Sequence, residues 1–168
     1  PMMDDPRHQA FKDMIAPSLA STGSLLRADS VRAHAAELVG LAVDRGVGNL
    51  ADDLAEPLAL RVVADIFGIP QDGRDQLLSW AHGAIALVDR RTGRPDDTSR
   101  ATFQAMAGYL QGVLAAKRRE PDLDFGSVLV HGRLPKDHGE PPLRTNEQEL
   151  NFVVLLMHAF EQTRNVLA

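Results

Sequence analysis

The sequence predicts a mainly α-helical protein, and three observations carry that prediction. Apolar residues recur every three or four positions along nearly the whole chain, which is the spacing of one helix face. Glycine or proline closes several of these apolar segments, as expected where helices end. Hydrophobic residues make up 44% of the chain and aromatic residues only 5%, so the core is expected to consist of Leu, Val, Ala, Ile and Met. The length of 168 residues favours one domain.

Local signals bound the expected helices. Pro17 or a residue soon after it closes the first helix, Gly46 and Gly48 end the second, and the Gly-Ile-Pro at 68–70 ends the third. A proline in the first turn of the third helix costs no hydrogen bond there. The cations at 117–119 suit the negative end of the fifth helix. The expected helices cover residues 4–19, 25–42, 56–67, 72–88, 99–119 and 125–130.

Two stretches lack the helical pattern, and a last helix follows them. Residues 90–97 are rich in Arg, Gly, Pro and Asp and are expected to form a mobile connection. Residues 132–142 contain three prolines and two glycines, which predicts a loop or a small hairpin. Thr145 resembles an N-cap, with Gln148 completing a capping box. Residues 150–157 are apolar on nearly every side, which predicts a central buried helix.

The composition disfavours several classes of protein. The net charge is −5, so no broad basic surface is expected to bind nucleic acid or an anionic membrane. The sequence has no cysteine, which excludes disulfides, zinc–thiolate sites, iron–sulfur ligation and a cysteine nucleophile within this chain. No apolar run reaches membrane-spanning length and the start lacks the layout of a signal peptide, so a cytoplasmic location is expected.

The closing stretch, residues 155–165, places a carboxylate and an amide at the end of an apolar helix. One interpretation is a helix that leaves the core, with Glu161 solvated or paired with Arg164 one turn on. The other is a polar notch in a buried helix, where Glu161 and Gln162 relay protons to a bound centre. The composition does not decide between these two interpretations.

Two histidines, His8 and His158, are considered for a ligand-binding role. His8 and Lys12 are four residues apart, so they share one helix face and can hold an anionic group, although taken alone they fit an ordinary solvated face better. His158 has no second histidine at metal-ligand spacing on its helix, so no metal site is expected. His34 and Glu37 are expected to face water.

Four segments, taken in order, resemble the bacterial cytochrome P-450 family. Residues 4–12, Asp-Asp-Pro-Arg-His-Gln-Ala-Phe-Lys, are similar to the Asp-Pro-Pro-x-His-Thr-x-x-Arg segment that begins the family's C helix. Residues 65–70, Asp-Ile-Phe-Gly-Ile-Pro, are similar to the Glu-Leu-Leu-Gly-Val-Pro that ends its E helix. Residues 143–150 resemble the lead-in to the I helix, and residues 158–165, His-Ala-Phe-Glu-Gln-Thr-Arg-Asn, fall on its Ala-Gly-x-Glu-Thr-Thr-Arg-Asn.

The resemblance covers essentially the whole chain and implies a partial domain. Residues 1–168 would form part of a single domain, the helical core of the cytochrome P-450 fold from the C helix to the I helix. The fold is then incomplete, with the sheet region and the half that carries the cysteine loop absent. The implied cofactor is haem b, and its axial cysteine is expected outside this chain.

The resemblance also implies residues that contact the haem. His8 and Lys12 fall where the family's His and Arg hold a haem propionate. Lys12 keeps the positive charge but loses the two-pronged contact of arginine. Ala159 falls where a glycine lets the I helix lie against the haem face, with His158 beside it. These two residues replace a smaller Ala-Gly pair and narrow the space for oxygen.

The remaining implied roles concern proton delivery and the substrate. Glu161 falls on the acid of the acid–alcohol pair that delivers protons to oxygen at the haem. Gln162 replaces the alcohol, and its amide can still hold a water molecule. Phe160 and Met157 are expected to line the substrate pocket. Val88 is also expected to line this pocket. In the resemblance, residues 80–88 and 98–106 fall on the F and G helices, which form the pocket's movable roof.

The implied function is a bacterial haem-thiolate monooxygenase of secondary metabolism. It would insert one oxygen atom of dioxygen into a small hydrophobic substrate, with electrons from a ferredoxin and its reductase. The alternative is a haem-free helper of the same family that stabilises a partner enzyme, which fits the lack of cysteine and the unusual Gln162. An unrelated helical bundle that binds nothing ranks last, because four ordered motifs would then be coincidence.

Overall fold

The computed structural model describes residues 3–25, 28–46, 48–85, 97–135 and 141–167. Within these ranges the regular structure is helical throughout and no strand occurs, so the predicted mainly α-helical class is confirmed. The elements are α1 (Arg7–Leu25), α2 (Ala28–Arg45), the π-helix η1 (Leu50–Ala55), α3 (Glu56–Phe67), the 3-10 helix η2 (Gln71–Gly73), α4 (Arg74–Ile85), α5 (Asp97–Arg119), α6 (Phe125–His131) and α7 (Thr145–Leu167).

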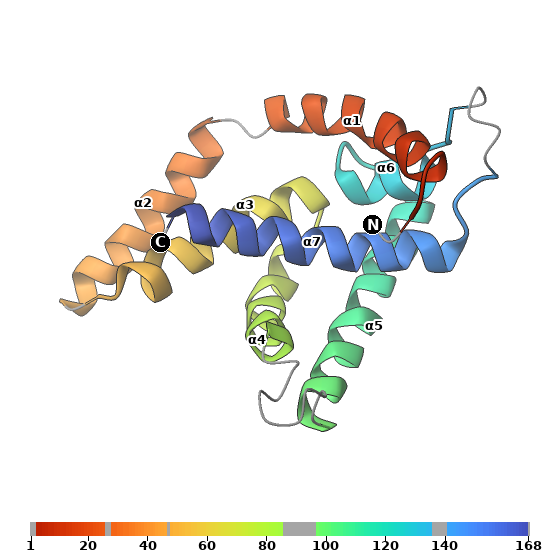
Figure 1. Cartoon of the computed structure of the whole chain (residues 1–168). Coiled ribbons are helices and arrows are strands. Elements are labelled where there is room, and N and C mark those ends of the chain that lie inside the picture. The colour runs from red at the N-terminus through yellow and green to blue at the C-terminus, as the bar shows by residue number, and fades with distance from the viewer. Residues whose placement is uncertain (1–2, 26–27, 47, 86–96, 136–140, 168) are drawn as a thin grey trace.

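Helix α7 runs across the middle of the molecule, and the other helices pack around it (Figure 1). It packs against α3, α5, α6 and η1. Helices α4 and α5 pack against each other and extend away from α7, whereas α1 packs on α6. Helix α2 packs on α3 and η1. Nearly every other helix therefore packs either on α7 or on a helix that contacts α7.

Three phenylalanines from three different helices meet in the core. The ring centroids of Phe67 on α3 and Phe125 on α6 are 4.8 Å apart, and those of Phe67 and Phe152 on α7 are 5.6 Å apart. Each is almost fully buried. Burial of one such side chain stabilises the fold by about 1.5–3 kcal/mol, so this cluster fixes the path of α7 over α3 and α6.

The end of α3 is the boundary that the sequence predicts most sharply. The helix begins at Glu56, carries Pro57 in its first turn and ends at Gly68, which adopts the left-handed conformation with φ of 73°. A side chain at Gly68 would also collide with the carboxylate of Asp124. Asp124 in turn caps α6, because the Ser127 N–H donates to its Oδ1 (2.8 Å). Gly68 is thus required by its own backbone and by the neighbouring helix.

The expected end of the first helix, at Pro17 or soon after it, is wrong. Helix α1 continues through Pro17 to Leu25. The proline lies on the exposed side of the helix, where water can solvate the backbone that its ring disturbs. The buried face of α1, with Ala10, Phe11 and Met14, carries the helix past this position.

The predicted cap of α7, Thr145 with Gln148, is also wrong. Arg144 and Glu147, each one residue earlier, form it instead. Glu147, rather than Gln148, reaches back to the start of the helix, and the Arg144 N–H donates to its Oε2 (2.7 Å). Gln148 is buried and accepts a hydrogen bond from Arg118 Nη2 (3.0 Å). A contact with another helix therefore outweighs the local capping pattern.

Helix α7 is buried along one face only, which corrects the expectation of burial on every side. Phe152, Val153, Leu156 and Phe160 lie in the core. On the other side Leu150 and His158 are exposed. Within the parts of the chain that the structure describes, no helix is both long and apolar enough to span a membrane.

Two of the expected connections fall largely outside the described residues. The expected connection at 90–97 lies within residues 86–96, which the structure does not describe, except that Asp97 begins α5. Val88 also lies outside the described residues. Residues 132–135 and 141–144 form no regular structure, which fits the predicted loop, and 136–140 lie outside the described ranges.

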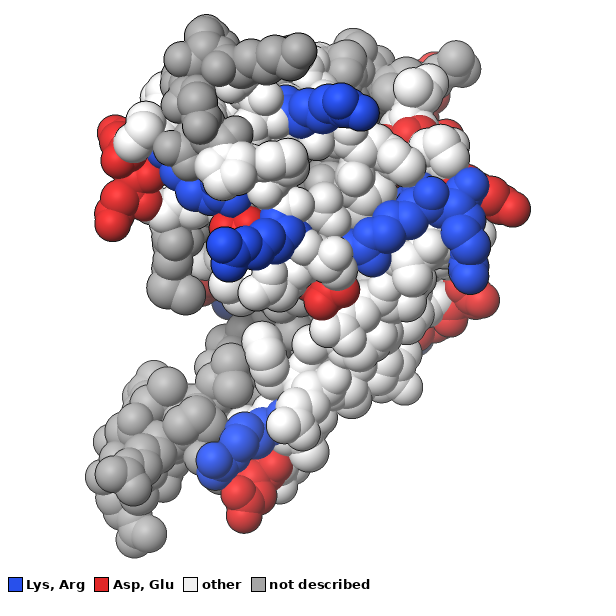
Figure 2. Space-filling model, turned by 90° about the vertical axis from the view of Figure 1, so that its right-hand side faces the viewer, with Lys and Arg blue, Asp and Glu red and all other residues white. Residues whose placement is uncertain are grey.

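Charged side chains of both signs share the face of the molecule seen in Figure 2. On this face Lys and Arg form separate groups, with Asp and Glu among and beside them (Figure 2). The described part of this face therefore presents no continuous field of one sign.

Candidate functional site

His8 and Lys12 lie one turn apart near the start of α1. The side chain of His8 is 39% exposed, and its Nδ1 lies 3.9 Å from Asp5 Oδ1, a long contact. Lys12 is exposed and forms no ion pair with any residue in the described ranges. Two donors on one helix face are therefore available to an anionic ligand.

The start of α1 is fixed to the start of α7 by Arg7. Its Nη2 donates to both carboxylate oxygens of Glu147, at 2.9 and 2.8 Å, and its Nη1 donates to the carbonyl of Pro141 at 3.0 Å. Burial acts to raise the pKa of Glu147, but the Arg144 N–H and the Arg7 guanidinium outweigh it and hold that pKa below its ordinary value. No local pattern in the sequence reveals this pair, because its partners are far apart in the chain.

The closing stretch of α7 is open to solvent on the side of its polar residues. His158, Glu161 and Gln162 are exposed, and Ala159 is half-buried. The Nδ1–H of His158 donates to the carbonyl of Val154 (2.8 Å), since that oxygen can only accept. This local bond fixes the imidazole against its own helix and leaves Nε2 on the exposed side.

Arg164 pairs with another helix rather than with Glu161. Its Nη1 lies 3.4 Å from Oε1 of Glu56, a buried carboxylate at the start of α3. The polar notch is therefore an exposed carboxylate and amide beside a cation that is engaged elsewhere. This placement leaves Glu161 and Gln162 accessible to a ligand.

The residues expected to line a substrate pocket differ in their surroundings. Phe160 is 1% exposed and lies in the core, so among the described residues it acts as a core side chain. Met157 is half-buried and packs against that core. Val88 lies outside the described residues. Of the two that the structure describes, Met157 is therefore the one whose outer side can meet a ligand.

The structure leaves the two candidate groups separate. No hydrogen bond or ion pair joins His8 or Lys12 to residues 158–162 in the described part of the chain. The group on α1 and the group on α7 are related through the Arg7–Glu147 pair, which links the beginnings of their helices. A direct link between the two groups therefore requires a ligand that contacts both.

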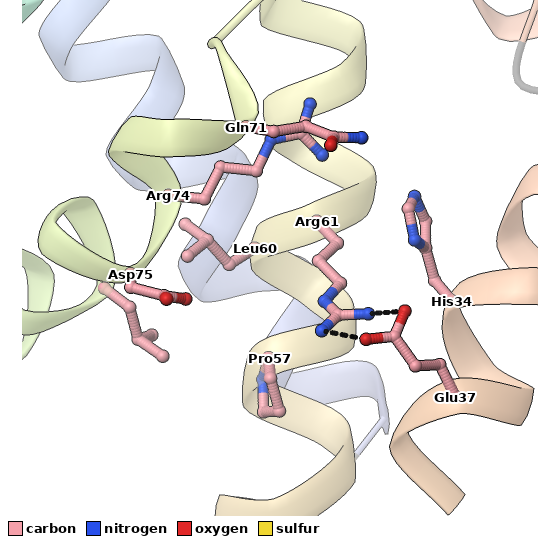
Figure 3. Close-up of a pocket in the computed structure, with 9 residues that line it drawn as sticks. His34, Glu37, Pro57, Leu60, Arg61, Gln71, Arg74 and Asp75 are labelled. Carbon is pink, nitrogen blue, oxygen red and sulfur yellow. Dashed lines mark hydrogen bonds and ion pairs between the residues drawn. The ribbon is translucent and has the colours of Figure 1, made fainter. Parts of the chain in front are cut away.

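A polar cleft of about 280 Å³, which the sequence did not reveal, opens between α2, α3 and α4 (Figure 3). Arg61 donates to both oxygens of Glu37, at 2.8 and 3.1 Å, across its wall. Glu37 is exposed, as expected, and this contact gives it a partner. The guanidinium of Arg61 is already satisfied by this carboxylate, so it is not available as an unpaired cation for a ligand in the cleft.

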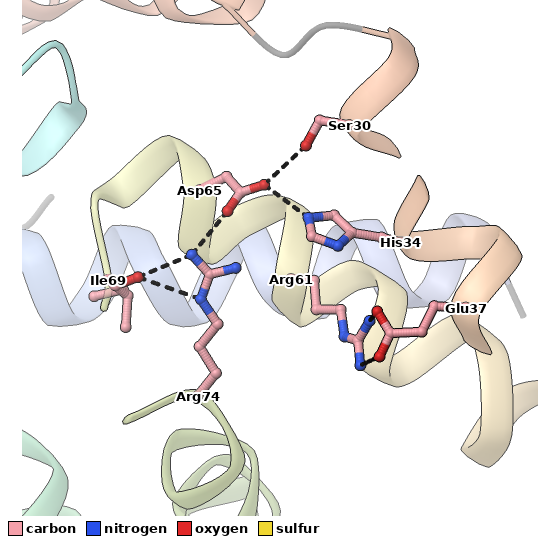
Figure 4. Close-up of polar contacts among 7 residues, drawn as sticks. All are labelled: Ser30, His34, Glu37, Arg61, Asp65, Ile69 and Arg74. Carbon is pink, nitrogen blue, oxygen red and sulfur yellow. Dashed lines mark hydrogen bonds and ion pairs between the residues drawn. The ribbon is translucent and has the colours of Figure 1, made fainter. Parts of the chain in front are cut away.

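Asp65 joins three helices behind that cleft (Figure 4). Its Oδ2 accepts from Ser30 Oγ (3.3 Å) and lies 2.9 Å from His34 Nε2, and its Oδ1 pairs with Arg74 Nη2 (2.7 Å). Arg74 also donates to the carbonyl of Ile69. Burial acts to raise the pKa of Asp65, but His34 and Arg74 outweigh it and lower that pKa. His34 is therefore a structural partner, not the solvated residue that the sequence predicts.

Known proteins of one family are similar to this chain in both sequence and structure. No family model matches the sequence. Cyclomarin C epoxidase CymV of Salinispora arenicola is 27% identical over 98% of this chain and 41% of its own length. The biotin biosynthesis cytochrome P-450 of Bacillus subtilis is 34% identical over 66% of this chain and 27% of its own length.

Solved structures agree with these relatives. The mixed-function P-450 MycG matches with a TM-score of 0.80 at 23% identity, over 96% of this chain and 39% of that protein. The chain thus spans less than half the length of the relatives it matches. Its helices form part of the helical core of the cytochrome P-450 fold, as the resemblance predicts. The chain belongs to the bacterial cytochrome P-450 family.

Proposed function

We propose that this chain is the C-to-I-helix portion of a bacterial haem-thiolate monooxygenase. The observation that carries the proposal is that proteins named as epoxidases and monooxygenases match 98% or more of the chain, among them CymV and the steroid C26-monooxygenase of Mycobacterium tuberculosis. The proposed protein works in secondary metabolism in the cytoplasm, and residues 1–168 are part of one domain.

The donors on α1 fit a haem propionate. His8 is partly exposed, Lys12 has no competing ion pair in the described ranges, and both lie on one helix face. A propionate carboxylate accepts hydrogen bonds from both groups. Because Lys12 is a point charge rather than a planar fork, it attracts the propionate without fixing its orientation.

The exposed polar residues of α7 fit the movement of protons. Haem, when bound, supplies the centre at which one atom of dioxygen enters the substrate and the other leaves as water, with two electrons and two protons consumed. Glu161 holds and releases a proton at its carboxyl group, and the Gln162 amide orients the water that carries it. His158 and Ala159 form the helix surface against the haem.

The substrate is a small hydrophobic molecule, and the electrons come from a ferredoxin and its reductase. Met157 on α7 is the proposed substrate contact, and Val88, which lies outside the described residues, is proposed as a second. Phe160 supports this wall from the core side. The apolar character of these three side chains favours an apolar substrate by excluding water.

Reduction under carbon monoxide tests the proposal. The natural protein that carries this sequence is purified, reduced and exposed to carbon monoxide, and its absorption spectrum is recorded. We expect the red-shifted band of a thiolate-ligated haem. A protein that takes up no haem contradicts the monooxygenase and favours the haem-free helper, whose binding to a co-purified enzyme is then the measurement to make.

A further inference from the structure

The Arg7–Glu147 pair differs from an ordinary surface ion pair. Its partners are 140 residues apart in sequence, and their side chains are only 19% and 28% exposed. Arg7 donates three hydrogen bonds to Glu147 and Pro141, and Glu147 also accepts the Arg144 N–H. The two guanidinium nitrogens thus hold a carboxylate and a backbone carbonyl at once, which fixes orientation as well as distance.

The fully buried face of α1 begins at Ala10, after Arg7 and His8. The buried face of α1 consists of Ala10, Phe11, Met14 and Ile15. Arg7 and His8 come before this face, in the first turn, where the His8 N–H donates to the Asp4 carbonyl and the Ala10 N–H donates to the Pro6 carbonyl, both at 3.0 Å. Arg7 ties this turn, which carries His8, to the start of α7.

We propose that Arg7 and Glu147 are positioning residues that fix the orientation in which His8 meets the haem propionate. This inference rests on the proposed function. Arg7 touches no ligand itself: it acts through the neighbouring His8, while Glu147 carries the constraint to α7, the helix proposed to lie against the haem face. Lys12 stands one turn further into the packed part of α1, so its position depends less on the pair.

The rate at which bound haem leaves the protein tests this inference. The natural protein with Arg7→Gln, or with Glu147→Gln, is mixed with an excess of a haem-scavenging protein. We expect haem to leave about tenfold faster than from the unchanged protein, which corresponds to the loss of one charged hydrogen bond to the propionate. Arg7→Lys keeps the charge but loses the planar guanidinium. Its rate of haem loss should fall between the rates of the unchanged protein and Arg7→Gln.

A matched control separates positioning from general loosening. Arg61 likewise donates two hydrogen bonds to a glutamate, Glu37, at 2.8 and 3.1 Å, but it joins α2 to α3. Arg61→Gln should leave the rate of haem loss unchanged. Thermal unfolding of each variant checks that the compared proteins are folded.

A double substitution decides whether Arg7 acts through His8. If it does, Arg7→Gln adds nothing to the rate of haem loss once His8→Ala is present. Fully additive effects overturn the inference, as does haem loss from Arg7→Gln at the unchanged rate while the unchanged protein holds its haem. If the unchanged protein binds no haem, the proposed function fails and this inference fails with it.

Discussion

Gly68 is the residue whose identity the structure requires most strictly. Its φ of 73° lies in the left-handed region, and a β-carbon there would meet the Asp124 carboxylate. Asp124 cannot move aside without loss, because it caps α6 and pairs with Lys117. Three costs therefore coincide at one position: backbone strain, steric overlap and a displaced buried carboxylate.

We expect Gly68→Ala to lower the free energy of unfolding by about 2–4 kcal/mol, from left-handed strain and overpacking together. Urea unfolding of the variant measures this loss. Gly112→Ala is the control, because Gly112 lies within α5 and an added β-carbon there would meet no neighbouring atom within 4 Å among the described residues. That substitution should be neutral or stabilise the helix. Equal effects at both positions would contradict the argument.

At the scale of helices, the Asp65 network is a polar link that joins α2, α3 and α4. Ser30 and His34 reach it from α2, and Arg74 reaches it from α4. Because the folded protein holds the pKa of Asp65 below its ordinary value of 3.8, the network stabilises the fold while that carboxyl is ionised. This contribution is present above the ordinary pKa and is lost as pH falls through the lowered value.

We expect Asp65→Asn to lower the free energy of unfolding by about 1–3 kcal/mol at neutral pH, because it removes one partner of a partly buried network. The difference between variant and unchanged protein should shrink as pH falls below the ordinary pKa of this carboxyl group and through its lowered value. Urea unfolding across this pH range measures the effect. Asp44→Asn, which changes an exposed carboxylate on α2, is the control and should show no such trend. A difference that does not vary with pH would contradict the role assigned to ionisation.

The same network shows where sequence patterns stop being informative. The bounds of α3 follow from Pro57 and Gly68, which act within one turn of themselves, and the sequence predicts them correctly. The partner of His34 lies 31 residues away on another helix, and no local pattern reveals it. The predicted cap of α7 is wrong for a related reason, because Gln148 is drawn into the core by a contact with α5.

In the candidate site too, the sequence reveals local features but not contacts between distant residues. The type and spacing of His8 and Lys12 can be read from the sequence, since residues four apart share a helix face. The role of Arg7 cannot be read from the sequence, because it depends on Glu147. That residue is 140 positions away, and only the complete fold places it beside Arg7. The exposure of Glu161 and the burial of Phe160 likewise depend on which face α7 turns toward α3 and α5.

At the scale of the whole molecule, apolar side chains remain exposed at the end formed by α2 and η1. Val39, Val43 and Leu50 are 47%, 70% and 61% exposed, and they line a groove of about 510 Å³. Clustered apolar surface of this kind promotes association, whereas single exposed apolar residues do not. Leu123 is such a single residue: it is 77% exposed and lies in the short connection between α5 and α6.

We therefore expect the 168-residue polypeptide, prepared by itself, to self-associate as its concentration rises. Val43→Lys combined with Leu50→Lys should weaken that association, because a charge in the groove must be desolvated when the apolar surfaces meet. Sedimentation velocity over a range of concentrations measures the change. Leu123→Lys introduces the same kind of charge outside the groove and should leave the association as it was. A polypeptide that stays monomeric throughout, or a Leu123→Lys variant that dissociates as readily as the double variant, would show that this groove does not drive association.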